Sequence, residues 1–128
     1  MSTDGPPKPA VLRGLAAQSY FFEEGCYVAE WSNSSVDESL SVAHIRVPAG
    51  TTTQWHRLDG IIERYVILSG EGRVEVGAEP ATLVSRGDVV VIPAGERQRI
   101  HNVGTDELIF LALCTPRFRP RAYIPLPD

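Results

Sequence analysis

Short β-rich segments that alternate with turn residues constrain this sequence most strongly. From about residue 19 onward, β-branched and aromatic residues gather in runs, and clusters of Gly, Pro, Asn and Asp separate them at roughly ten-residue intervals. Segments with a helical apolar period are missing. The pattern predicts an antiparallel β-sandwich or β-barrel. The runs are SYFFEE, CYVAEW, SLSVAHIRV, ERYVIL, RVEV, DVVVIP and LIFLALC.

The chain length bounds the domain organisation. With 128 residues, one domain fits and a second has no room. We expect the barrel over residues 16–116 and a flexible tail over 1–15, because the first nine residues hold three prolines and a glycine. The Pro- and Arg-rich residues 117–128 are expected to pack on the barrel or on a partner subunit. The run Val89–Ile92 is apolar throughout, which predicts a strand buried on both faces.

The charge balance excludes some partners. A net charge of -4 gives no general attraction to phosphate backbones or anionic lipid, so we expect neither nucleic-acid nor membrane binding. The first residues do not resemble a secretory signal, and no apolar run is long enough to cross a bilayer. We therefore expect a cytoplasmic protein, in which Cys26 and Cys114 remain free thiols.

Two spaced motifs carry the candidate chemistry. The first lies within residues 48–72 and places a His and a Glu between two glycines, and its landmarks are Gly50, His56, Leu58, Glu63 and Gly70. The second lies within residues 87–102, and its landmarks are Gly87, Pro93, Gly95, Gln98 and Asn102.

Both motifs resemble those of the cupin superfamily, in order and in spacing. The family usually has a second His where this chain has Leu58, and a His where it has Gln98. The resemblance implies an all-β fold, the double-stranded β-helix or cupin jelly-roll barrel, in a single domain. The chain is similar to a group of small stand-alone cupins. The cupin fold by itself does not indicate a function, because it carries many unrelated ones.

Strand alternation predicts which side chains share a face. If the apolar members of each strand point inward, the polar members on the same face are buried with them and need partners. The three sets are His56 with Leu58; Glu63 with Tyr65 and Ile67; and Gln98 with Ile100 and Asn102.

A divalent metal is one partner that could satisfy these groups. The resemblance implies metal ligation by His56 and Glu63, with Gln98 as a weaker substitute, and Leu58 cannot ligate. Iron, manganese, nickel and zinc are the ions considered. The alternative is that the three polar side chains bond to one another without a metal, so that Glu63 and His56 form an acid/base pair.

Further residues are assigned by their faces. We expect Tyr65 to place its hydroxyl beside Glu63 as a catalytic acid or donor, or to pack in the core, and Leu58, Arg46 and Ile100 to line the pocket. Arg46 and His44 share one face of their strand, and the alternative is that this face points to solvent and not to the pocket. His101 lies on the face opposite Gln98 and would need a β-bulge to become a ligand. Cys114 is expected to be buried as a small apolar group or, less simply, to act as a thiol ligand.

Two functions follow as hypotheses. One is a metal-dependent enzyme acting on a small polar metabolite, as an isomerase, dioxygenase, cyclase or lyase. The other is a metal-free module that binds a small molecule without turnover, which Leu58 favours because it makes the pocket more apolar. The resemblance also implies a homodimer.

Overall fold

The computed structural model describes residues 7–128, and its strands form two antiparallel sheets. No helix among the described residues has the length and apolar character that a membrane span requires. The strands are β1 (Tyr20–Phe22), β2 (Cys26–Ser32), β3 (Ser41–Val47), β4 (His56–Leu58), β5 (Ile62–Ser69), β6 (Glu71–Val76), β7 (Thr82–Ser85), β8 (Val89–Ile92), β9 (Gln98–Asn102), β10 (Leu108–Thr115) and β11 (Tyr123–Pro125).

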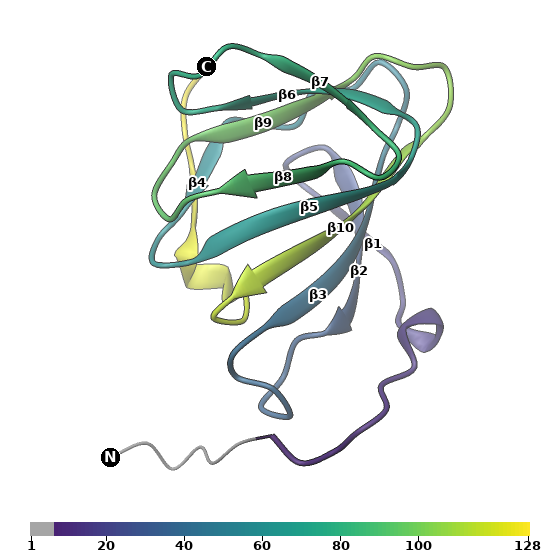
Figure 1. The fold of residues 1–128 in the computed structure, drawn as a ribbon, viewed down its shortest axis with the longest axis vertical. Coiled ribbons are helices and arrows are strands. Elements are labelled where there is room, and N and C mark those ends of the chain that lie inside the picture. Colours follow the sequence, from purple (N-terminus) through teal and green to yellow (C-terminus); the bar gives the residue numbers. More distant parts are fainter. Residues whose placement is uncertain (1–6) are drawn as a thin grey trace.

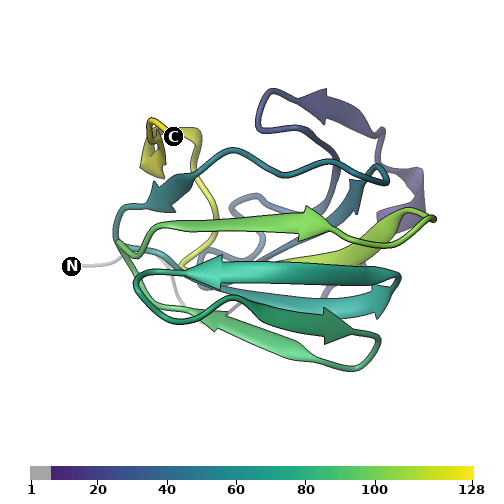
Figure 2. The ribbon, with the colours of Figure 1, turned by 90° about the horizontal axis from the view of Figure 1, so that it is seen from above.

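The strand order is that of a jelly roll. One sheet runs β1-β2-β3-β10-β5-β8, and the other runs β11-β4-β9-β6-β7. In Figure 1, β6, β7 and β9 lie above β8, β5, β10 and β3, and Figure 2 shows the layers from above. Strands far apart in sequence therefore pair, as β3 and β10 do along seven residue pairs.

The apolar core lies between the sheets because inward and outward residues alternate along the strands. In β10, buried residues alternate with half-buried ones over the whole strand, and β9 follows the same pattern. The faces predicted from the sequence are confirmed for β4, β5 and β9: the residues named on each predicted face are all buried. The core cluster includes Ile67, Val74, Ile100, Leu108 and Phe110.

The prediction for Val89–Ile92 is wrong. Val90 and Ile92 are buried, but Val89 and Val91 are 59% and 61% exposed. The physical reason is that the fold has two sheets, so only one face of β8 meets the core; β8 is also an edge strand, so its outer face has a neighbouring strand on one side only.

The two ends of the chain differ in how they contact the barrel. The predicted tail 1–15 begins in residues 1–6, which lie outside the described part of the chain. A 3₁₀ turn, Gly14–Ala16, follows and packs Gly14 so closely on Trp31 that a Cβ there would lie 2.5 Å from the ring. At the other end, a second 3₁₀ turn, Pro120–Ala122, leads into β11, which pairs with β4 of the same barrel.

Candidate functional site

A cavity of about 70 Å³ opens inside the barrel, and its lining is mostly apolar. Such a volume accommodates several water molecules or one small chemical group. Its walls come from strands of both sheets and from the C-terminal segment. The polar side chains that reach it include Glu24, His56, Glu63 and Cys114.

His56 is held in one orientation by its neighbours. It begins β4, is 3% exposed, and its Nδ1 lies 2.8 Å from the carbonyl oxygen of Gln54. Because that oxygen only accepts, Nδ1 carries the proton of the neutral ring and Nε2 keeps a lone pair. Burial lowers the pKa of His56, which favours this neutral form. The ring of Tyr123 stacks on the imidazole at a centroid distance of 4.7 Å.

Glu63 is a buried carboxyl with one unused oxygen. It lies on β5 and is 8% exposed. Burial raises its pKa to about 7, and the Gln98 amide and Cys114 thiol oppose that rise. The Cys114 thiol donates to Oε2 across 3.8 Å, whereas Oε1 has no hydrogen-bond partner. The amide of Gln98 therefore affects the pKa of Glu63, although no hydrogen bond of normal geometry joins the two.

Gln98 uses its amide oxygen for a different contact. The Tyr65 hydroxyl donates to Oε1 of Gln98 across 2.6 Å, and both side chains are buried. Nε2 of Gln98 has no partner. Burial raises the pKa of Tyr65 well above its ordinary value, so the phenol stays protonated and keeps this bond.

Glu24 is a site residue that the sequence did not reveal. The sequence marks Glu24 and Gly25 only as a turn, and the structure turns the chain there with a positive φ of 107° at Gly25. The Glu24 side chain enters the pocket, where Oε2 lies 3.2 Å from Nδ1 of His56. Burial and then repulsion from Glu63 raise the pKa of Glu24 to about 8, against a hydrogen bond from the Cys26 thiol. The sequence signals Glu24 only by an acidic residue two positions before the β-rich run CYVAEW.

The predicted ligands do not form a three-ligand metal site in the positions that the structure gives them. His56 and Glu63 each present a free donor atom, but the third predicted ligand, Oε1 of Gln98, is occupied by Tyr65. Over residues 7–128, no group of three or more His, Cys, Asp and Glu side chains has an arrangement that could hold a metal ion. Of the three predicted ligands, only two therefore keep a free donor atom, which is fewer than structural and catalytic metal sites normally use.

Of the other residues predicted to line the pocket, one does and two do not. Leu58 lines the cavity, as expected. The placement of Arg46 in the pocket is corrected, because it lies on the outer face of β3 with its guanidinium 2.6 Å from Glu107 and over the ring of Tyr27. The placement of Ile100 is corrected too, since it is fully buried in the apolar core and does not reach the cavity.

His101 and Cys114 have distinct positions. His101 faces away from the barrel interior, and its Nδ1 lies 2.6 Å from the hydroxyl of Thr52. Cys114 is 3% exposed and lines the cavity. Burial, followed by repulsion from Glu63, raises the pKa of the Cys114 thiol, so it remains a neutral donor.

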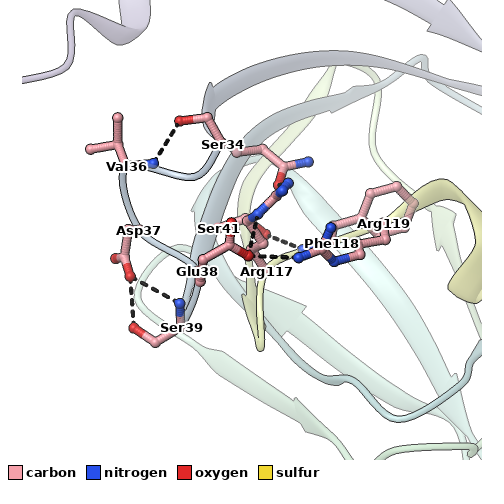
Figure 3. Close-up of polar contacts among 10 residues, drawn as sticks. Ser34, Val36, Asp37, Glu38, Ser39, Ser41, Arg117, Phe118 and Arg119 are labelled. Carbon is pink, nitrogen blue, oxygen red and sulfur yellow. Dashed lines mark hydrogen bonds and ion pairs between the residues drawn. The ribbon is translucent and has the colours of Figure 1, made fainter. Parts of the chain in front are cut away.

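Ion pairs and a hydrogen bond hold the pocket wall that contains Phe118. Glu38, in the loop between β2 and β3, accepts hydrogen bonds from Arg117 at 3.0 Å and from Arg119 at 2.6 Å (Figure 3). The backbone N–H of Phe118 donates to the Ser41 hydroxyl at 2.9 Å. These contacts hold Phe118 in the pocket lining.

Fold and pocket together define a small jelly-roll barrel with an interior cavity. A sequence model described as Cupin domain matches residues 43–114, more than half of the chain. The chain therefore belongs to the cupin family, as the two motifs predicted.

Individual relatives agree with this assignment. The chain is 33% identical over 82 residues to an uncharacterised protein of Streptomyces coelicolor, covering 62% of this chain and 74% of that protein. It is 34% identical over 71 residues to the oxalate-binding protein of Thermotoga maritima, covering 56% and 58% respectively. Pac13 from Streptomyces, a nucleoside dehydratase, has the same fold, with a TM-score of 0.77 at 15% identity over 93% of this chain and 92% of Pac13.

Proposed function

We propose that this protein is a small cupin enzyme that uses general acid–base chemistry on a small polar molecule. The observation that carries the proposal is the set of three titratable groups in one apolar pocket: Glu24, His56 and Glu63. The pKa values of Glu24 and Glu63, about 8 and about 7, lie close to neutral pH, so each carboxyl can both give and take a proton there. Isomerisation and elimination of water are the reactions that such a set supports.

The residues divide into two roles. Glu63 is the base or acid that meets substrate, since Oε1 is unpartnered, and the lone pair on Nε2 of His56 is a second proton acceptor. Glu24 acts on His56 from its Nδ1 side, where a carboxylate stabilises the imidazolium that forms when Nε2 takes a proton. Tyr65 positions Gln98 through its hydrogen bond and is a positioning residue.

Turnover of candidate substrates tests the proposal. Neutral nucleosides and sugars, starting with uridine because Pac13 structures contain it, are incubated in D₂O and followed by NMR for deuterium incorporation or loss of water. We expect turnover by the parent protein and a decrease of about 10²- to 10⁴-fold in Glu63→Gln. Glu71→Gln, an exposed carboxyl on β6, is the matched control. Equal turnover in Glu63→Gln and the parent would contradict the proposal.

The second candidate is binding without turnover. Leu58 and the other apolar lining residues favour it, because they leave few polar groups to act on a ligand. The same NMR samples separate the two: ligand resonances that broaden or shift without any chemical change indicate a binding module.

A metal-dependent version needs a change in the pocket. Gln98 would have to release Tyr65 to become a third ligand beside His56 and Glu63. Metal analysis of protein purified without a His-tag tests this version, with the double variant Leu58→His/Gln98→His as the positive control. Stoichiometric metal in the parent that is lost in Glu63→Ala would support it.

We also propose a homodimer. The exposed apolar side chains Leu83, Val89 and Val91, at 70%, 59% and 61%, lie on neighbouring edges of the two sheets. Covering such an edge with a second copy removes apolar surface from water. Light scattering tests the dimer, and a monomeric mass would contradict it.

A further inference from the structure

The inner pocket shares a wall with a larger outer cavity. The outer cavity measures about 620 Å³, and five residues line both cavities: Tyr20, Phe22, Glu30, Phe118 and Tyr123. We call this outer cavity the vestibule. Four of the five shared residues are aromatic, and the rings of Phe22 and Tyr123 meet edge to face at 5.0 Å. A flat ring is the shape that such a wall accommodates.

The charged side chains of both cavities have one sign. Glu24, Glu30 and Glu63 line the inner pocket, and Glu23 lines the vestibule. Neither lining contains a Lys or an Arg among the described residues. The one basic group there, His56, is biased to its neutral form by burial. Above about pH 8, where Glu24 and Glu63 are both ionised, a negatively charged ligand would therefore meet repulsion without a compensating Lys or Arg side chain.

The two arginines on either side of Phe118 in the sequence do not change this balance. Arg117 and Arg119 both bind Glu38, and Arg117 also donates to Asn33 at 3.1 Å. Their charge is directed at the loop between β2 and β3, as Figure 3 shows.

Unpartnered polar atoms show which hydrogen bonds a ligand must supply. Four buried side-chain atoms have no hydrogen-bond partner: Oε2 of Glu24, Oε1 of Glu63, Nε2 of Gln98 and the hydroxyl of Tyr123. Oε2 of Glu24 also lies 3.2 Å from Nδ1 of His56. Carboxylate oxygens accept, so the ligand atoms that match Glu24 and Glu63 are N–H or O–H donors, whereas Nε2 of Gln98 matches an acceptor.

We propose that the inner pocket and the vestibule together select ring-shaped ligands that carry no negative charge, with N–H or O–H donors directed at Glu24 and Glu63 and the ring against the vestibule aromatics. This substrate class rests on the proposed function of the same pocket. It separates this protein from binders of small dicarboxylates, because no Lys or Arg among the described residues lines either cavity to meet an acid.

Three probes of nearly the same shape test the charge rule. Benzamidine, benzamide and benzoate differ in charge at one end of the same ring, and their binding is measured by calorimetry at about pH 9, where both pocket carboxyls are ionised. We expect millimolar binding of benzamidine and benzamide, and binding of benzoate at least about tenfold weaker. Benzoate binding as tight as that of benzamide, or no binding by any probe, would overturn the proposal.

Two variants locate the binding. Phe118→Ala should weaken benzamidine and benzamide binding by about tenfold, whereas Phe21→Ala, an equal truncation at a 60% exposed ring, should leave it unchanged. Circular dichroism checks that both variants fold. Equal affinities in the two variants would show that the probes bind elsewhere, which also overturns the proposal.

A third variant tests the charge itself. Glu63→Gln should reduce the preference for benzamide over benzoate by about tenfold, and the exposed Glu71→Gln should not change it. The readout is binding alone, so a failure of the acid–base proposal in the turnover assay leaves this result standing. An unchanged preference in Glu63→Gln would contradict the assignment of ligand donors to that carboxyl.

Discussion

Two buried side-chain amides on β9, four residues apart on the same face, differ in how completely they are hydrogen-bonded. Asn102 donates from Nδ2 to the carbonyl oxygens of Val47 and Asp106 at 2.9 and 2.8 Å, and its Oδ1 accepts from the N–H of Gly104 at 2.9 Å. Gln98 has one bond, from Tyr65, and an unpartnered Nε2. Each side chain is 1% exposed.

The difference separates the barrel interior into two halves. Near Asn102 the interior is filled by apolar side chains such as Ile100 and Leu108, and the one amide there is fully used in holding loops to strands. Near Gln98 the interior is open, and polar atoms of Glu24 and Glu63 are left over. A satisfied buried group stabilises a fold, whereas an unsatisfied one is available to a ligand.

The largest expected effect concerns packing in the two halves. Ile100→Ala should lower the free energy of unfolding by about 2–5 kcal/mol, because it opens a new cavity in the filled half. Ile45→Ala, the same truncation in the pocket wall, should cost less, because the removed atoms already border empty space. Urea denaturation measures both. Equal losses would show that the two halves are packed alike.

The amides themselves give the next effect. Asn102→Ala should cost about 2–3 kcal/mol, because it leaves buried backbone groups without partners. The double variant Tyr65→Phe/Gln98→Leu removes both members of the other bond and should stay within about 1 kcal/mol of the parent protein. A double variant as unstable as Asn102→Ala would place Gln98 among the residues that hold the fold together.

The pocket carboxyls should make stability fall as pH rises. Their folded pKa values of about 8 and about 7 exceed the ordinary value, so the folded protein retains protons that the unfolded chain releases. The free energy of unfolding then decreases by up to about 1.4 kcal/mol per pH unit for each group. His56, whose pKa is lowered in the folded protein, contributes in the opposite direction, and this contribution fades as the pH rises past the ordinary His pKa of about 6.5.

Denaturation at a series of pH values measures this slope. Glu63→Gln should flatten it below about pH 7, whereas Glu71→Gln should not. Stability that increases with pH over this range would mean that the carboxyls are not buried as described.

The smallest effect is expected outside the barrel. Arg46→Ala removes a half-exposed ion pair with Glu107 and should cost about 0–1 kcal/mol. Because Arg46 lies on the outer face, ligand binding in the pocket should not change, and calorimetry with benzamide checks this. A weakened affinity would return Arg46 to the pocket where the sequence had placed it.

The sequence by itself determined the fold class and the burial of several candidate site residues. The spacing of landmarks around His56 and Glu63 predicted the family, and the strict alternation of side chains along a strand placed Glu63, Tyr65 and Gln98 inside. These predictions succeed because they depend on local geometry, which two or three neighbouring residues set.

Only the tertiary structure decided what those side chains meet. Glu24 enters the pocket because a turn between β1 and β2 lies beside β4, and Oε1 of Gln98 is occupied because β9 faces β5 across the interior. Val91 is exposed because no third layer covers the outer face of the sheet that contains β8. Such contacts join residues tens of positions apart, so no local pattern encodes them, and the pairing of strands settles which polar groups remain for a ligand.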